Sequence, residues 1–441
     1  MAGNMAAHPS FKIDETPSIA RALKNAGWML GGKGAGGLLS LGYLALAARG
    51  LGLVGFGTFA TILAYGQAIA NLASFQSWQA VVRYGVEHLT AHRYASLERL
   101  LRFTVKVDLL AAVTGLIAAF GGLVLVGPAL GWQAEQCRLA GLFLLSLLIS
   151  QRGAVLGMLR LSGRFDHAAL AEASLPLFRL VGAAVAYVAG GGIGAFLLAW
   201  AVAELGCSLM LWAAALLAFR WLPAASTTQS SKAGVFLENP GIGRFLLATS
   251  AAASVGLAWQ QLPTLAVGLF SGPAGAGIYR LASQLGLALT KPVTALARAV
   301  FPELVIAVKG GSPAALRPML ARIVGGTVGF GLFALIVVAL AGRTALELVG
   351  GPAYAAAYPV LVLLTAASVI MLAGFGLEPT LVAAGRPWTA LGARALATGC
   401  YSCVILLLVP RFGAIGMGWS AIVGALLSTL FLHIAFVRAC R

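Results

Sequence analysis

Residues 193–218 read IGAFLLAWAVAELGCSLMLWAAALLA, a run of 26 residues with one charged side chain, Glu204. A helix needs about 20 mainly apolar residues to cross the hydrocarbon core of a bilayer. Within lipid, only helices and closed barrels satisfy every backbone hydrogen bond. Barrel strands are alternating segments of about ten residues, unlike this continuous run. We therefore predict a transmembrane helix here.

The rest of the chain has the same character. Of its 441 residues, 60% are hydrophobic and 10% are charged, whereas soluble domains carry roughly 25% charged residues. The sequence therefore predicts an all-α polytopic membrane protein. We expect twelve spans, at 26–48, 53–77, 107–127, 137–157, 168–189, 193–218, 245–269, 275–303, 323–342, 357–380, 389–409 and 414–436.

These spans divide into two lobes of six, residues 26–220 and 245–441, with a cytoplasmic segment at 1–25 and a cytoplasmic linker at 221–244. Short motifs recur in the two halves at a nearly constant offset of 220–222 residues. They are Gly57-Thr58-Phe59 with Gly277-Ile278-Tyr279, Gly163-Arg164 with Gly385-Arg386, and Ile193-Gly194 with Ile415-Gly416. Parallel repeats of this kind build transporters whose substrate path lies between the halves. Chance similarity between Gly- and Ala-rich sequences is the alternative.

The positive charges orient the chain. With the N-terminus in the cytoplasm, the inner segments hold 21 Lys and Arg residues and the outer segments hold four. Cytoplasmic loops of membrane proteins carry this excess. We expect a multi-pass protein of the bacterial inner membrane with both termini in the cytoplasm. The bias accounts for most of the net charge of +17 without a nucleic-acid partner.

Five cations remain inside the predicted spans. They are Lys33, Arg179, Arg280, Lys291 and Arg298. A cation deep in a span costs at least about 2.5–3.5 kcal/mol, so such residues usually face a water-filled path or a partner. At 100° per residue, Arg280, Lys291 and Arg298 share one face of span 275–303, spread over roughly 27 Å. Residues 245–302 contain no acidic residue. The stripe therefore indicates an anionic substrate, and snorkelling of Arg280 and Arg298 to the interfaces is the alternative.

The remaining charged residues leave more alternatives open. Lys33 lies in a glycine-rich stretch that suits a hinge, or it snorkels to the inner interface. Arg179 lies seven residues after Glu172 and either faces the substrate or forms an interhelical ion pair. Glu204 and Glu172 are candidates for H⁺ or Na⁺ coupling, and a buried neutral acid is the alternative for Glu204. No metal or cofactor site is expected.

Catalytic signatures are missing from the sequence. Residues 27–34, GWMLGGKG, approach a phosphate-binding loop but have Gly34 where the Mg²⁺-binding Ser or Thr belongs. Glycosyltransferases and polymerases usually need a large outer loop or interfacial carboxylates, and neither is evident. A transporter is therefore favoured over an enzyme.

Several segments together resemble the polysaccharide, or O-antigen-type, flippases. They are residues 48–52 with 56–59, residues 277–282 with Phe301-Pro302-Glu303-Leu304, and Gly163-Arg164-Phe165. The resemblance runs from about residue 20 to 436. It implies two lobes that alternate access and carry undecaprenyl-pyrophosphate-linked oligosaccharide to the outer leaflet for O-antigen or exopolysaccharide synthesis. Polymerases and glycosyltransferases are the partners that it implies.

On this hypothesis, Arg280, Lys291 and Lys33 attract the pyrophosphate while the lipid tail stays in the bilayer. Arg298 and Arg179 complete the candidate set. The rival hypothesis is a cation-coupled multidrug antiporter of the same superfamily, whose cationic cargo would call for acidic groups in the central cavity.

Overall fold

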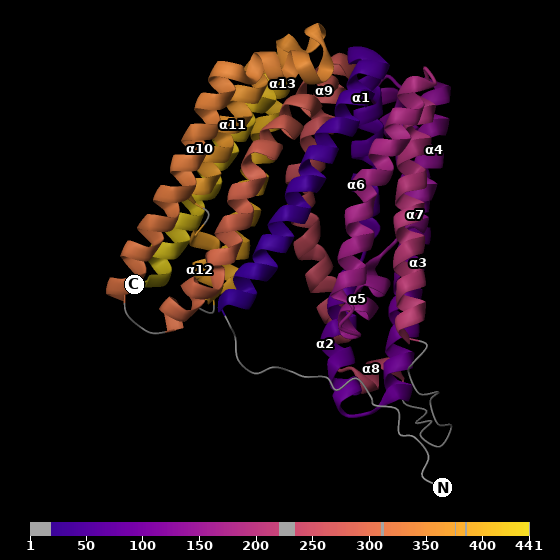
Figure 1. Cartoon of the computed structure of the whole chain (residues 1–441), viewed down its shortest axis with the longest axis vertical. Helices are drawn as coiled ribbons and strands as arrows, with labels where there is room; N and C mark the ends of the chain where they lie inside the picture. Colours follow the sequence, from indigo (N-terminus) through magenta and orange to yellow (C-terminus); the bar gives the residue numbers. More distant parts are fainter. Residues whose placement is uncertain (1–18, 220–233, 310–312, 375, 384–385, 441) are drawn as a thin grey trace.

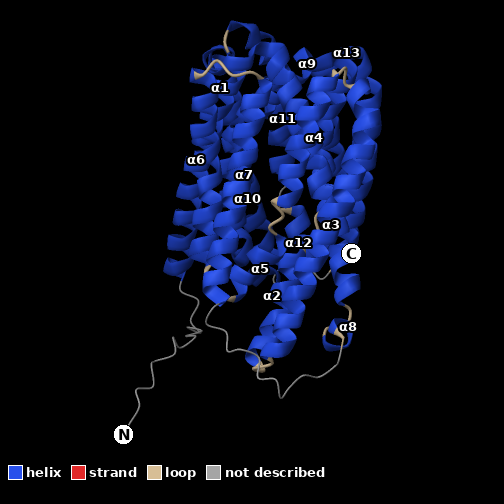
Figure 2. Ribbon diagram, turned by 90° about the vertical axis from the view of Figure 1, so that its right-hand side faces the viewer, coloured by secondary structure: helices blue, strands red, loops and turns tan. Residues whose placement is uncertain are grey.

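The computed structural model describes residues 19–219, 234–309, 313–374, 376–383 and 386–440, and no side chains of 19–35 or 290–323. The described chain consists of helices joined by short turns (Figure 2). The helices are α1 (Ile19–Ala73), α2 (Ser77–Thr90), α3 (Tyr94–Ala129), α4 (Ala134–Ile149), α5 (Gly153–Leu161), α6 (Phe165–Val188), α7 (Ile193–Phe219), α8 (Val235–Glu238), α9 (Ile242–Lys309), α10 (Pro313–Gly350), η2 (Pro352–Ala357), α11 (Tyr358–Ala373), α12 (Leu377–Ala383) and α13 (Pro387–Cys440).

Three of these helices reverse direction at a glycine and make two passes each. Helix α1 turns at Gly52 (φ 67°), α9 at Gly272 (φ 70°) and α13 at Gly413 (φ 57°). A positive φ is costly for residues with a Cβ atom, so glycine suits these sharp turns. With the single passes, these helices confirm the predicted polytopic fold and its two lobes of six.

The repeat is visible in the backbone as well as in the sequence. Gly52 and Gly272 are 220 positions apart, and so are Gly131 and Gly351, which also have positive φ. The breaks between α4 and α5 and between α11 and α12 likewise fall at equivalent places in the two halves. Shared turn geometry at a shared offset supports an internal repeat over chance similarity.

The two lobes join at one end of the molecule and diverge toward the other (Figure 1). We call these the Gly52 end and the α2 end. At the Gly52 end, the Arg49 guanidinium donates to the backbone carbonyls of Leu348 and Val349. The Tyr354 ring packs edge-on against Phe56, 6.1 Å between centroids. These contacts link α1 of the N-lobe to α10 and η2 of the C-lobe.

The first pass of α9 lies against the N-lobe, although it begins the C-lobe in sequence. The Gln261 amide donates to the Gln67 side chain at 3.0 Å, and the Gln76 backbone N–H donates to Ser250 Oγ at 3.2 Å. The second pass packs on α11, where a Cβ on Gly286 would meet Leu361. Helix α9 therefore crosses from one lobe to the other at Gly272.

Two parts of residues 78–106, predicted only as a connection, are helical. They contain most of α2 and the first three turns of α3. Helix α2 buries Ala80, Val81 and Tyr84 at spacings that repeat along one face. His88, near the C-terminal end of α2, is 1% exposed, and its Nε2 lies 2.9 Å from Asn239 Oδ1.

Candidate functional site

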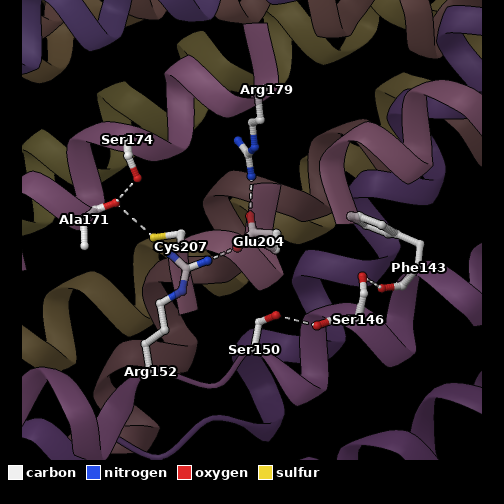
Figure 3. A network of polar contacts seen from close by, with 9 residues as sticks. All are labelled: Phe143, Ser146, Ser150, Arg152, Ala171, Ser174, Arg179, Glu204 and Cys207. Carbon is white, nitrogen blue, oxygen red and sulfur yellow. Dashed lines mark hydrogen bonds and ion pairs between the residues drawn. The ribbon is translucent and has the colours of Figure 1, made fainter. Parts of the chain in front are cut away.

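Glu204 lies in the middle of the N-lobe between two arginines, as Figure 3 shows. Its carboxylate accepts a hydrogen bond from Arg179 of α6 at 2.5 Å and another from Arg152, which lies between α4 and α5. Side-chain exposure is 9% for Glu204, 14% for Arg179 and 20% for Arg152. We call these three residues the ionic triad. Two cations around one carboxylate leave the triad with a net charge of +1.

The local sequence explains why Glu204 and Arg152 lie in the ionic triad. Glu204 is the single charged residue of α7, whose other buried residues, such as Trp200 and Cys207, lie on the same face. A buried ion is tolerated when paired and hydrogen-bonded. Arg152 is available because α4 ends at Ile149 and α5 begins at Gly153, which places it in a helix break.

Aromatic rings complete the surroundings of Arg179. Its guanidinium carbon lies 5.7 Å from the Trp200 ring centroid and 5.9 Å from that of Tyr43. Tyr43 of α1 and Trp200 themselves pack edge to face at 5.0 Å. The negative faces of such rings attract a cation. Arg179 Nε is nevertheless buried with no hydrogen-bond acceptor among the described residues.

Arg280 of α9 reaches the same region from the other side. Its side chain is half-buried, and Tyr43, Tyr279 and Arg179 lie within its electrostatic range. Its Nε is buried without an acceptor, and no carboxylate of the described residues forms an ion pair with it. An unsatisfied buried donor costs about 1–3 kcal/mol, and more when charged. Tyr43 therefore lies within electrostatic range of two guanidinium groups, each with an unpaired Nε–H.

Sequence reasoning missed Asp108, which holds the helix break in place. Its carboxylate accepts hydrogen bonds from the Ala154 backbone N–H at 2.7 Å and from Ser77 Oγ. A carboxylate at the first turn of a helix satisfies free N–H groups and complements the helix dipole. The available signal was the position of Asp108 at the edge of predicted span 107–127. The break that it contacts was hidden because residues 137–157 were predicted as one continuous span.

The structure brings together only part of the predicted set. Arg179 and Arg280 lie near one another, while the side chains of Lys33, Lys291 and Arg298 are outside the described residues. Glu172 is exposed and is not the partner of Arg179. Glu204 is buried, as its structural alternative expected, and it contacts two arginines, Arg152 and Arg179. Arg152, which is outside the predicted set, joins Arg179 at Glu204.

A family model described as "Polysaccharide biosynthesis protein" matches residues 22–308. The inner membrane protein YghQ of Escherichia coli strain K12 is 28% identical over 349 residues, which covers 76% of this chain and 94% of that protein. The region matched by the family model contains the ionic triad and Arg280.

Solved structures share the fold at low sequence identity. The lipid II flippase MurJ in an inward closed conformation has a TM-score of 0.70 and 13% identity, covering 96% of this chain and 89% of that chain. An inward-facing multidrug resistance transporter of the MATE family has a TM-score of 0.69 and 15% identity, covering 92% and 94%. Both share the two-lobed transporter fold. With more than half of its length matched by the family model, the chain belongs to the polysaccharide biosynthesis protein family.

Proposed function

We propose that this protein is a flippase for a lipid-linked oligosaccharide whose head group is a pyrophosphate. The cargo moves from the cytoplasmic to the outer leaflet of the bacterial inner membrane by alternating access. The observation that carries the proposal is the pair of guanidinium groups, Arg179 and Arg280, which lie within electrostatic range of each other and of Tyr43 and have unpaired Nε–H donors.

The chemistry of these donors favours a phosphate-bearing cargo. Arginine presents a planar fork of N–H groups that matches phosphate oxygens, and charge-assisted hydrogen bonds are roughly twice as strong as neutral ones. The ionic triad leaves a charge of +1 and Arg280 adds another, so the region attracts anions even with Glu204 ionised. A pyrophosphate supplies the acceptors that the described protein atoms do not.

The arrangement of the lobes supports the direction of transport. The excess of Lys and Arg in the loops of the α2 end supports a cytoplasmic location for that end. The lobes are joined at the Gly52 end and diverge toward the α2 end (Figure 1), which is the arrangement of a protein that loads from the cytoplasm. Arg179 belongs to one lobe and Arg280 to the other. A rocking motion of the lobes therefore changes the separation of the two guanidinium groups and with it the affinity for the anion.

A cation-coupled multidrug antiporter shares the same fold, so charge is what separates the two candidates. Such a protein needs acidic groups free to bind a cationic cargo. Glu204 is paired with two arginines, and Asp108 is engaged by Ser77 and the Ala154 backbone. Glu172 is unpaired among the described residues but exposed, so it is the buried described charges that favour an anionic cargo.

The test is binding and transport with Arg280→Ala. Purified protein in lipid nanodiscs is titrated with inorganic pyrophosphate, and export of surface polymer is measured in a strain that lacks its own flippase gene. We expect R280A to weaken pyrophosphate binding at least about tenfold, because a charge-assisted hydrogen bond contributes about 1.5–3 kcal/mol. Export should fall in parallel.

Arg411→Ala is the matched control, because Arg411 is exposed at the Gly52 end beside Gly413. It should leave binding and export unchanged. The proposed function would be contradicted if R280A bound pyrophosphate as tightly as the wild type does. It would also be contradicted if the wild type bound an organic cation more tightly than pyrophosphate.

A further inference from the structure

An apolar groove of about 550 Å³ lies in the C-lobe between α10, α11, α12 and α13. Its lining includes Ala373, Leu377, Leu426 and Leu430, with His433 as the one ionisable side chain. The hydroxyl of Thr429, which also lines it, donates to the Ile370 carbonyl at 3.3 Å. The groove is therefore apolar over almost its whole surface. Its volume falls within the roughly 300–1,000 Å³ of small-molecule pockets.

The internal repeat assigns this groove a counterpart in the N-lobe. Leu426 stands 222 positions after Glu204, the same offset that relates Gly163 to Gly385. The break between α11 and α12, which the groove adjoins, corresponds to the break between α4 and α5 that holds Arg152. The place of the ionic triad in one lobe is thus the place of the apolar groove in the other.

This asymmetry is informative because the two lobes have the same fold. The N-lobe buries three charged groups at this position. The C-lobe has Leu426 at the position equivalent to Glu204, and an apolar groove lies beside it. Helix breaks at equivalent positions of two repeats are where such transporters form their binding sites. A substrate that contacts both lobes at these positions has one charged part and one hydrocarbon part.

We propose that the groove binds part of the polyprenyl chain of the lipid-linked substrate while the N-lobe and Arg280 bind its head group. This inference rests on the proposed function and replaces the expectation that the whole tail stays in the bilayer. Apolar cavities exclude water and accept hydrocarbon. The groove adjoins α12 and the last part of α13, from Leu426 to His433. In the proposed orientation this part faces the cytoplasmic leaflet, so a chain entering from that leaflet reaches the groove first.

The polyprenyl chain gains free energy on moving from the bilayer to the groove because its shape matches the groove. Lipid tails are as apolar as leucine, so transfer from lipid to the groove brings little hydrophobic energy. A branched polyprenyl chain that matches the groove gains dispersion contacts and is held in register with its head group. The groove therefore selects the kind of chain and positions it, and chain position is the property to measure.

The experiment maps the chain directly. Full-length protein in nanodiscs is mixed with a polyprenyl pyrophosphate that carries a photoreactive diazirine in its first isoprene units, irradiated, and digested for mass spectrometry. We expect labelled peptides from residues 369–377 and 426–433. Unlabelled polyprenyl pyrophosphate should reduce the labelling at least tenfold, and an equal excess of a diacyl phospholipid should not.

Leu430→Trp fills the groove and should reduce this labelling about tenfold while leaving binding of inorganic pyrophosphate unchanged. Leu407→Trp is the matched control, because Leu407 is on the same helix, 60% exposed and outside the groove. If inorganic pyrophosphate binds but the label maps to lipid-facing residues, or phospholipid competes equally, the groove inference is wrong. If pyrophosphate itself fails to bind the wild type, the proposed function fails instead.

Discussion

Gly57 and Gly277 pack against each other between the two lobes, at equivalent positions of the internal repeat. A Cβ atom on Gly57 would lie 1.7 Å from the Pro273 carbonyl oxygen and 3.0 Å from the Gly277 backbone nitrogen. A Cβ on Gly277 would lie 2.7 Å from the Leu53 carbonyl oxygen. The two residues are 220 positions apart, so the axis relating the lobes passes close to both. Backbone contact at the axis lets the lobes meet here.

Gly57→Ala should force the lobes apart at the Gly52 end. The clash is with backbone, which cannot rotate away as a side chain can, and overpacking of this kind typically costs about 1–3 kcal/mol. We expect the lobe contacts of Arg49 and Tyr354 to loosen and the population to shift away from the arrangement described here. Spin-label distances between α4 and α10 at this end should increase in the variant.

Gly121→Ala in α3 is the matched control, because no atom lies within 4 Å of the Cβ it would add. It should leave the distances unchanged and slightly favour the helix. Unchanged distances in G57A would mean that the lobes do not meet at these glycines.

Glu204→Gln should destabilise the N-lobe strongly. The substitution leaves Arg152 and Arg179 buried without a counter-charge, and breaking a buried ion pair in this way costs about 3–5 kcal/mol. Thermal unfolding of the purified protein in detergent measures the effect. We expect E204Q to unfold several degrees below the wild type.

Glu172→Gln provides the comparison, because Glu172 is an exposed acid one helix away and forms no ion pair among the described residues. Its stability should stay within about 0.5 kcal/mol of the wild type. Equal stability of E204Q and E172Q would show that the triad does not form in the membrane protein.

The sequence predicted the lobes and most of the spans, because apolar length is a local property. Span 193–218 differs from α7 by one residue at its C-terminal end. The break at Arg152 escaped prediction because α4 and α5 on either side of it are mostly apolar. The break is held by Asp108, which lies 46 residues before its backbone partner Ala154. Tertiary partners of this kind leave no local pattern.

The candidate site was predicted less completely than the fold. Intramembrane position alone identified Arg179, Arg280 and Glu204 as unusual, which follows from the cost of burying charge. The pairing of Arg179 with Glu204 instead of Glu172 depends on how α6 and α7 pack, and helical spacing within α6 could not give it. The proximity of Arg280 to Tyr43 depends on the crossing of α1 and α9 between lobes.

Asp108→Ala should release the start of α5. The loss of an N-terminal cap typically costs about 1 kcal/mol, and here it also removes the acceptor of Ser77. Hydrogen–deuterium exchange of residues 153–161 should become faster. Ser77→Ala, which leaves the bond to Ala154 intact, should accelerate exchange less. Equal protection in D108A and the wild type would argue against this cap.

Glu238 of α8 forms an ion pair with Arg99 of the N-lobe, and removing the charge of Glu238 should weaken this contact. Its carboxylate accepts hydrogen bonds from Arg99 Nε at 3.0 Å and Ser96 Oγ at 3.1 Å. Glu238→Gln should loosen α8 by about 1–2 kcal/mol and speed hydrogen exchange at residues 235–239. Glu98→Gln is the control, because its pair with Arg102 is 50–72% exposed and contributes about 0.3–0.5 kcal/mol.

The same contact predicts a response to acid but none near neutral pH. Hydrogen bonds from Arg99 hold the pKa of the Glu238 carboxyl below its usual value. The stabilisation is therefore complete above the unfolded pKa of about 4.3 and is lost as the pH falls through the lowered folded value. Exchange at residues 235–239, corrected for its intrinsic pH dependence, should be constant from pH 5 to 8 and rise only below about pH 4. A transition near neutral pH would contradict control of this contact by the Glu238 carboxyl.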